Sequence, residues 1–263
     1  MTLSERAVSG HAAPLPEPWR SAAVTVVLPT YNEAENLPVI VAELFSLPLT
    51  GLRVLVADDN SPDGTGAIAD ELVKQYGADR MSVMHRPGKQ GLGRAYVDGM
   101  TQALRAGAEF VVQMDSDLSH SPQYLPPMLG TLLATDADVV IGSRYVSGAS
   151  LAREWSWQRK ALSGFANMYV RVLLHMGVRD VTAGFKLWRA SALTAIDVAS
   201  IESNGYSFQV EMNYRTVKRG LKIIELPIHF ADRRAGDSKM SVKVQLESAL
   251  MPFVLRRRSR QPH

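Results

Sequence analysis

The sequence of 263 residues contains no cysteine. It can form neither a disulfide framework nor a thiolate zinc site, which favours a reducing compartment. No apolar run reaches the roughly 18 residues that a membrane-spanning helix needs, and the N-terminal region lacks the apolar segment of a signal peptide. If this protein acts at a membrane, we therefore expect it to do so from outside the bilayer.

The signatures of several common enzyme classes are also missing. No G-x-G-x-x-G follows the first expected strand, and neither G-x-x-x-x-G-K-[ST], G-x-S-x-G nor H-E-x-x-H occurs. These absences disfavour a dinucleotide-binding protein, a P-loop NTPase, a hydrolase with a nucleophile elbow and a zinc protease. The glycines within residues 90–94 follow the third expected strand, and we expect them to open a helix that packs closely on its neighbours.

Apolar runs alternate with helical patterns through the first half of the chain. This alternation predicts an α/β fold with a doubly wound, mostly parallel sheet flanked by helices. We expect the first helix to be capped by Asn32. The second half is less regular, and there we expect helices over 155–176 and 206–219 and a strand over 223–230, in which Pro227 indicates an edge position. The strands expected in the first half are 24–28, 53–57, 81–85, 109–112 and 138–142.

Asp115 and Asp117 follow the fourth expected strand with a single residue between them. Two carboxylates so close repel each other unless a cation lies between them or one takes up a proton. An oxygen-ligated divalent cation, held partly by a substrate diphosphate, suits this pair, although an isolated D-x-D is more often a solvated turn. In an open α/β sheet the loops that follow the strands gather at one edge, where ligands bind. The charged residues that four such loops bring there are Glu33, Asp58, Asp59, Asp63, Asp115, Asp117 and Arg144. This convergence favours metal-assisted transfer from a nucleotide diphosphate compound.

The helix expected over 155–176 has a polar stripe and an apolar stripe. One interpretation is a helix that packs its apolar face on the sheet, and the other is a helix that rests at a membrane interface. The sequence leaves both open. The polar residues Arg159, Ser163, Asn167, Arg171 and His175 lie opposite Leu162, Phe165, Tyr169, Val172 and Met176.

Basic residues cluster near the C-terminus, where four arginines lie within residues 256–260. They can be a solvated terminus or can contact anionic lipid headgroups. Nucleic-acid binding is poorly supported, because no aromatic residues are interleaved with these charges. We divide the chain into a flexible N-terminal tail (1–21), a catalytic domain (22–240) and a C-terminal amphipathic helix with a basic tail (241–263).

Seven motifs follow one another between about residues 24 and 240: VVLPTYNEAENL, VADDNSPDGT, GLGRA, MDSDLSHSP, IGSRY, TAGFKLWR and DRRAGDSKM. Their succession resembles the family 2 glycosyltransferases, and within these the dolichyl- or polyprenyl-phosphate mannose synthases. The resemblance implies a GT-A fold. It also implies inverting transfer of mannose from GDP-mannose to a polyprenyl or dolichyl monophosphate, with Mg²⁺ or Mn²⁺ as the cofactor.

The motif positions imply where the donor and its metal bind. Asp59 would face the guanine, Asp115 would lie near the ribose or the metal, and Asp117 would ligate the metal. Ser119 stands where relatives often have glutamine, and its shorter side chain would ligate the metal directly or leave room for a water. The implied donor-binding residues are Pro29, Tyr31, Glu33, Ala57, Asp59, Asp115, Ser116, Asp117, Arg233 and Lys239.

The acceptor phosphate would be held by arginines. Arg144 and Arg159 resemble the pair that grips the lipid phosphate in the family, and Ser238 belongs to the loop that also carries Arg233 and closes over the diphosphate. Because the second pKa of a phosphate monoester lies near ~6, this nucleophile is already an anion and needs no general base. The catalytic roles would fall to Asp117, Arg144, Arg159 and Arg233. Arg144 could otherwise form a strand-end ion pair, and we expect a structural hydrogen-bonding role for His120.

The polyprenyl chain of such an acceptor lies in the bilayer. Some relatives carry transmembrane helices after the catalytic domain and others borrow them from a partner, and this chain resembles the second kind. We expect peripheral attachment at the cytoplasmic face of the cell membrane, through residues 155–176 and the last helix, aided by a transmembrane partner protein. A UDP-glucose enzyme with the same acceptor and a catalytically silent sugar-nucleotide sensor are the alternatives, and the intact D-x-D argues against the second.

Overall fold

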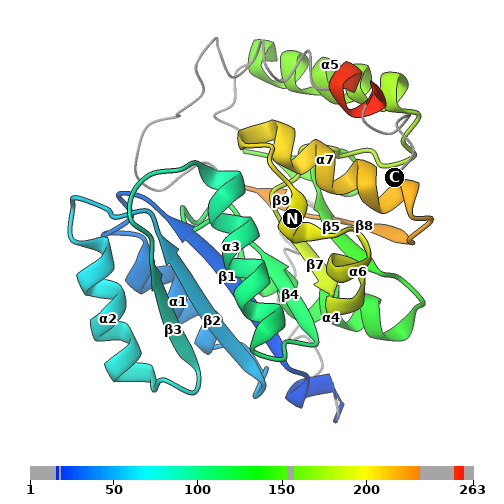
Figure 1. The fold of residues 1–263 in the computed structure, drawn as a ribbon. Coiled ribbons are helices and arrows are strands. Elements are labelled where there is room, and N and C mark those ends of the chain that lie inside the picture. Colours follow the sequence, from blue (N-terminus) through cyan, green and yellow to red (C-terminus); the bar gives the residue numbers. More distant parts are fainter. Residues whose placement is uncertain (1–15, 18, 153–156, 232–251, 258–263) are drawn as a thin grey trace, which may run out of the picture.

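The computed structural model describes residues 16–17, 19–152, 157–231 and 252–257, without the side chains of residues 159 and 160. A seven-stranded sheet of order β3-β2-β1-β4-β7-β5-β8 forms its centre (Figure 1). A second, smaller sheet pairs β6 (Ser150–Leu151) with β9 (His229–Phe230). The strands of the large sheet are β1 (Val24–Thr30), β2 (Leu52–Asp58), β3 (Met81–His85), β4 (Phe110–Gln113), β5 (Val139–Ser143), β7 (Lys186–Arg189) and β8 (Ile223–Pro227).

The large sheet is parallel except at β7, which runs antiparallel to both of its neighbours, β4 and β5. The other pairs, β1 with β2, β1 with β4, β2 with β3 and β5 with β8, are parallel. Because β7 reverses direction between β4 and β5, those two strands point the same way. The carboxyl ends of β1, β2, β4 and β5 therefore meet at one edge, and the expected mostly parallel sheet is confirmed.

Helices cover both faces of the sheet. Val27 of β1 packs in a core with α3, α6 and α7, whereas Val26 and Leu28 point to the other face and pack with α1, α2 and α4. Burial on two faces explains why β1 is an apolar run without alternation. The helices are α1 (Leu37–Phe45), α2 (Thr65–Tyr76), α3 (Leu92–Arg105), α4 (Leu125–Ala134), α5 (Trp157–Leu174), α6 (Ala190–Ala195) and α7 (Gly205–Lys218).

Glycines allow the start of α3 to pack closely on the loop before α7. A Cβ at Gly93 would lie 2.3 Å from the carbonyl oxygen of Ser203, and Gly91 has a φ of 97°. Only glycine fits such an approach and such a φ without strain. The structural role expected for the glycines of this segment is confirmed.

Two details differ from the expected elements. Asn32 does not cap α1: the helix begins at Leu37 with Asn36 at the capping position, and Asn32 has a φ of 59° in the preceding loop. The strand expected over 223–230 is two strands in different sheets, β8 and β9. β8 is an edge strand of the large sheet, so the edge position indicated by Pro227 is confirmed.

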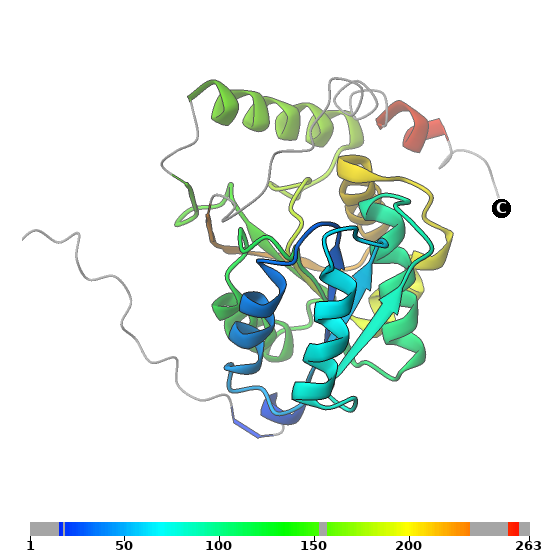
Figure 2. The ribbon, with the colours of Figure 1, turned by 90° about the vertical axis from the view of Figure 1, so that its left-hand side faces the viewer.

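The helix α5 turns the middle of its polar stripe towards the protein and exposes most of its apolar stripe. Asn167 is 3% exposed, whereas Leu162, Phe165 and Val172 are 59%, 60% and 67% exposed. Leu162, Phe165 and Val172 therefore do not pack on the sheet, whereas Tyr169 and Met176 of the same stripe pack in the core. In Figures 1 and 2, α5 lies beyond α7 at one end of the molecule.

Residues 252–257 are helical and lie beside α5 (Figures 1 and 2). Leu255 is buried in the same core cluster as Val170 and Leu174, and Arg256 Nη1 donates to the carbonyl oxygen of Leu173 at 3.4 Å. The rest of the helix expected here lies outside the described residues. Within the part of the chain that the structure describes, no helix has the length and hydropathy needed to cross a bilayer.

Candidate functional site

The loops after β1 and β2 are fastened to each other by two aspartates. Asp58 Oδ1 accepts hydrogen bonds from Thr30 Oγ1 at 2.9 Å and from Ser61 Oγ at 2.6 Å. Asp63 accepts from the backbone of Ala34 at 3.1 Å and from Thr65 Oγ1 at 2.5 Å. Burial opposes the charge of Asp63, but these donors prevail and lower its pKa. Asp58 and Asp63 therefore shape the two loops, and their carboxylates are already occupied.

The donor-binding residues predicted in these loops lie close together. Pro29 of β1 is opposite Ala57 of β2 in the parallel register. The Lys89 ammonium lies 3.9 Å from the ring centroid of Tyr31. Glu33 Oε2 accepts from the side-chain amide of Asn36 at 2.8 Å. The structure thus brings the residues predicted for the nucleoside to one end of β1 and β2.

Asp59 is held by a buried arginine that the sequence analysis missed. The Arg86 side chain is 3% exposed and forms an ion pair with Asp59. Its guanidinium also donates to Asp98 of α3 at 3.0 Å and to Gln90 Oε1 at 3.1 Å. A planar guanidinium can hold several acceptors in fixed directions, so Arg86 sets the orientation of the Asp59 carboxylate.

The D-x-D segment lies against the end of β1. Ser116 Oγ donates to the carbonyl oxygen of Pro29 at 2.9 Å, which ties the loop after β4 to the loop after β1. Asp115 Oδ1 accepts from the hydroxyl of Tyr96 at 2.7 Å. Asp117 Oδ1 accepts from both the backbone N–H and the hydroxyl of Ser119, at 3.1 Å and 2.6 Å. The predicted convergence of the first and fourth loops is therefore observed, and Ser119 orients Asp117.

Two buried groups beside the aspartates are uncharged near neutral pH. Burial lowers the pKa of His120, although Asp115, 4.0 Å from its Nδ1, works in the opposite direction. Burial and the nearby Asp115 raise the pKa of the Tyr96 hydroxyl. His120 packs against the rings of Phe185 and Phe230, with centroids 5.2 Å away, and its Nδ1 has no hydrogen-bond partner among the described residues. His120 is a packing residue here, and the hydrogen bond expected of it is not made at Nδ1.

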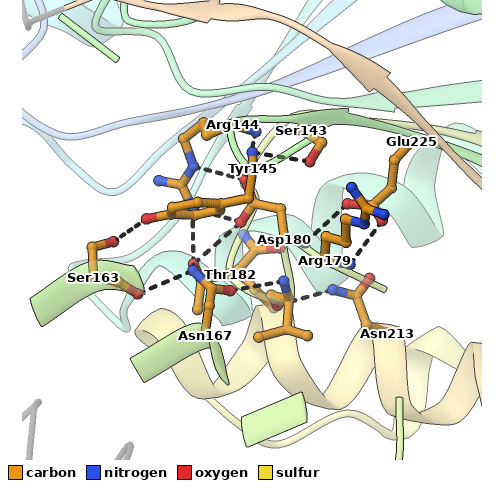
Figure 3. Close-up of polar contacts among 12 residues, drawn as sticks. Ser143, Arg144, Tyr145, Ser163, Asn167, Arg179, Asp180, Thr182, Asn213 and Glu225 are labelled. Atoms are coloured by element: carbon orange, nitrogen blue, oxygen red, sulfur yellow. Dashed lines mark hydrogen bonds and ion pairs between the residues drawn. The ribbon is translucent and has the colours of Figure 1, made fainter. Parts of the chain in front are cut away.

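Arg144 is held at the end of β5 by Asp180 (Figure 3). Its Nε and Nη2 atoms each donate to one oxygen of the Asp180 carboxylate at 2.8 Å, and Nη2 also donates to Thr182 Oγ1 at 2.8 Å. Burial disfavours both charges, but their attraction raises the pKa of Arg144 and lowers that of Asp180. The strand-end ion pair considered for Arg144 thus exists. Among the described residues, Nη1 makes no hydrogen bond.

A buried lysine, Lys186, lies in β7, between β4 and β5 of the sheet. Lys186 Nζ donates to Gln209 Oε1 at 2.6 Å, and the same oxygen accepts from Gln113 Nε2 at 2.7 Å. Burial lowers the pKa of Lys186 to about 7, against the attraction of Asp180. This lysine therefore changes charge close to neutral pH in the middle of the sheet.

Several predicted residues cannot be placed. Arg233, Ser238 and Lys239 lie outside the described residues. Arg159 lies in the first turn of α5, but its side chain is likewise not described. The roles predicted for these four residues remain predictions.

The carboxylates of Asp115 and Asp117 suit a hard divalent cation. Both are close to the sheet edge, and a set of carboxylate and hydroxyl oxygens matches the ligand preference of Mg²⁺ or Mn²⁺. Across the described ranges, no group of three or more histidine, aspartate or glutamate side chains is arranged as a metal site. A bound diphosphate and water would supply further ligands.

Sequence reasoning missed Arg86, Tyr96, Asp180 and Lys186. Arg86 directly follows β3, so its position at a strand end was a usable signal. Asp180 reaches Arg144 across 36 residues, and Tyr96 reaches Asp115 across 19 residues. No local sequence pattern predicts such pairs, because they depend on how separate elements pack.

The chain is similar to known proteins over most of its length. A family model described as glycosyl transferase family 2 matches residues 25–196. A polyprenol monophosphomannose synthase from Mycolicibacterium smegmatis is 46% identical over 216 residues, which are 82% of this chain and 80% of that protein. An undecaprenyl-phosphate mannosyltransferase from Micrococcus luteus is 43% identical over 218 residues, which are 83% of this chain and 87% of that protein.

Solved structures share the fold at lower identity. Glucosyl-3-phosphoglycerate synthase from Mycobacterium tuberculosis, in complex with Mn²⁺, UDP and phosphoglyceric acid, matches with a TM-score of 0.64 at 20% identity, over 92% of this chain and 80% of that chain. A mannosyltransferase from Pyrobaculum calidifontis in complex with GDP-Man and Mn²⁺ matches with a TM-score of 0.60 at 16% identity, over 92% and 66% of the two chains. These similarities confirm the expected GT-A-like fold.

Proposed function

Because the chain belongs to glycosyl transferase family 2, we propose that it transfers mannose from GDP-mannose to a polyprenyl monophosphate. The observation that carries this proposal is its 46% and 43% identity to two proteins whose names specify mannose and a polyprenyl phosphate. The identities extend over more than four-fifths of the chain.

In the proposed reaction, an oxygen of the polyprenyl phosphate attacks C1 of the mannose. The new C1–O bond forms on the face opposite the leaving GDP, so one displacement inverts the anomeric centre. The phosphate is an anion near neutral pH, and the protein need not remove a proton from it. Its task is to orient the two substrates and to screen the repulsion between their phosphates.

The donor would bind at the ends of β1, β2 and β4. Tyr31 and Asp59 would contact the nucleoside, and the buried ion pair with Arg86 would present the Asp59 carboxylate in one orientation. Asp115 and Asp117 would hold Mg²⁺ or Mn²⁺, which would neutralise negative charge on the leaving diphosphate. Ser119 would keep Asp117 in place through its hydroxyl. Arg233 and Lys239 would cover the diphosphate.

The acceptor phosphate would bind at Arg144 and Arg159. Nε and Nη2 of Arg144 are directed to Asp180 and Thr182, which leaves Nη1 for an oxygen of the phosphate. An arginine already fixed by a carboxylate loses little side-chain entropy when it binds the phosphate, so the ion pair aids positioning.

The protein would reach the polyprenyl chain by resting α5 on the membrane surface. Its outward side chains include Phe165, Met168 and Val172, and an exposed apolar face of this kind suits the headgroup region of a bilayer. Phe253 and Val254 add exposed apolar surface from the neighbouring helical residues. We propose that this end of the molecule rests on the cytoplasmic face of the cell membrane, together with a transmembrane partner protein.

A transfer assay tests the proposal. The full chain is incubated with GDP-mannose or UDP-glucose, and with vesicles that contain undecaprenyl phosphate, with and without a chelator of divalent cations. We expect mannosyl lipid from GDP-mannose alone and its loss with the chelator. Glucosyl lipid from UDP-glucose alone would overturn the donor assignment, and no transfer from either donor would overturn the enzymatic proposal.

A further inference from the structure

The helix that exposes its apolar face is fixed to the protein by side-chain hydrogen bonds on its polar face (Figure 3). Ser163 Oγ accepts from the hydroxyl of Tyr145 at 2.6 Å. Asn167 Oδ1 accepts from the backbone N–H of Val181 at 2.9 Å, and its Nδ2 lies 3.4 Å from Thr182 Oγ1. α5 is therefore attached to two segments, the one that follows β5 and the loop at 180–182.

Both attached segments adjoin Arg144. Tyr145 is the next residue in the chain, and Thr182 Oγ1 accepts from Arg144 Nη2 at 2.8 Å. A threonine hydroxyl has two acceptor lone pairs and one donor hydrogen. In Thr182 the lone pairs face Arg144 and Asn167, and the hydroxyl lies 3.5 Å from Asp180 Oδ1. Thr182 is thus the point where the helix and the arginine meet.

The loop that carries Thr182 is itself held from the core side. Glu225 of β8 accepts from the backbone N–H groups of Arg179 and Asp180 at 2.7 Å and 2.9 Å. Asn213 of α7 donates to the carbonyl oxygen of Val181 at 2.9 Å. Its backbone is held in this way, so the position of α5 reaches Arg144 through the side-chain contact between Asn167 and Thr182.

We propose that Thr182 and Asn167 are positioning residues that aim Arg144 at the acceptor phosphate and make its aim depend on the seating of α5. This inference rests on the proposed function, because it assumes that Arg144 binds that phosphate. With Nε and Nη2 committed, the direction of Nη1 follows from the position of Thr182 and Asp180. A helix resting on lipid would thereby place the binding arginine at a set distance from the membrane surface.

Kinetics with undecaprenyl phosphate in phosphatidylglycerol–phosphatidylcholine vesicles test the inference. Thr182→Val removes the hydroxyl at nearly constant volume, and Thr182→Ser restores it. We expect Thr182→Val to raise the KM for undecaprenyl phosphate about tenfold, as befits the loss of a hydrogen bond to a charged group, with the KM for GDP-mannose unchanged. Thr182→Ser should stay within about twofold of the wild type. Thr194→Val, which removes a threonine hydroxyl on α6 away from Arg144, is the matched control and should leave both constants unchanged.

Other results would overturn the inference. An unchanged acceptor KM in Thr182→Val, or equal losses in Thr182→Val and Thr182→Ser, would show that the hydroxyl does not aim Arg144. If Thr182→Val does not fold, Asn167→Ala decides in its place, because it should raise the acceptor KM while the donor KM stays constant. These failures leave wild-type transfer intact, whereas a wild-type chain that transfers no mannose refutes the proposed function itself.

Discussion

The buried Lys186 should make the stability of this protein depend strongly on pH. Burial lowers its pKa from 10.5 to about 7 in the folded state, while the unfolded chain keeps the ordinary value. Between these pH values the unfolded state binds a proton that the folded state does not bind, so the free energy of unfolding rises with pH. The difference of about 3.5 units, at ~1.36 kcal/mol per unit, corresponds to about 5 kcal/mol over the window.

Lys186→Met isolates this contribution. Methionine has a similar length and no charge, and Gln209 Oε1 retains its hydrogen bond from Gln113. Urea unfolding between about pH 7.5 and 9.5 should give a wild-type free energy of unfolding that rises more steeply than that of the variant, by up to ~1.4 kcal/mol per pH unit. The variant should also be the more stable protein at the lower end of this range, because it no longer buries a proton-binding amine.

A surface lysine provides the control for the slope. Lys74 of α2 is exposed beside Glu71, which raises its pKa above 10.5, so Lys74→Met should keep the wild-type pH dependence over this range. Equal slopes for the wild type and Lys186→Met would refute the reasoning, because they would show that Lys186 keeps its proton in the fold.

Three further changes test the site and the membrane face. Asp117→Asn keeps a hydrogen-bond acceptor for Ser119 and removes one carboxylate charge. Mannosyl transfer should fall at least about a hundredfold while the melting temperature stays unchanged. Undiminished turnover would refute the metal assignment. Arg86→Gln leaves the carboxylate of Asp59 without its cation, which should cost about 3 kcal/mol in unfolding experiments and raise the KM for GDP-mannose more than that for the lipid. An unchanged KM for GDP-mannose would contradict the proposal that Asp59 contacts the donor. Phe165→Asp should weaken cosedimentation with anionic vesicles roughly tenfold or more without lowering stability, since the side chain is exposed, and unchanged cosedimentation would contradict attachment through α5.

The strand ends show how far the sequence could predict the site. Each of β1, β2, β4 and β5 is an apolar run followed by a polar loop, and parallel strands bring such loops to one edge whatever the details of packing. The placement of Asp115 and Asp117 beside Pro29 follows from that rule. The strand β7 could not be predicted in this way, because its four residues are too few to show a pattern and its antiparallel direction depends on its neighbours.

The amphipathic helix shows where the sequence pattern alone was insufficient. Its period of four revealed two stripes but not which of them faces the protein. The orientation depends on partners at distant positions, Tyr145 for Ser163 and Val181 for Asn167. Buried polar groups need such partners, and their availability on the adjoining loops decided that Ser163 and Asn167 point inward.

The sequence by itself determined the α/β fold, the edge of the sheet where the candidate site lies and the carboxylate pair of the D-x-D segment, because these follow from short-range patterns that repeat along the chain. Only the tertiary structure decided how the charges are paired. The members of each pair are far apart in the sequence: Arg144 pairs with Asp180, Arg86 pairs with Asp59, and the amine of Lys186 pairs with the amide of Gln209. Burial makes an unpaired charge costly, and the partner that offsets the cost is chosen by packing, which no local pattern records.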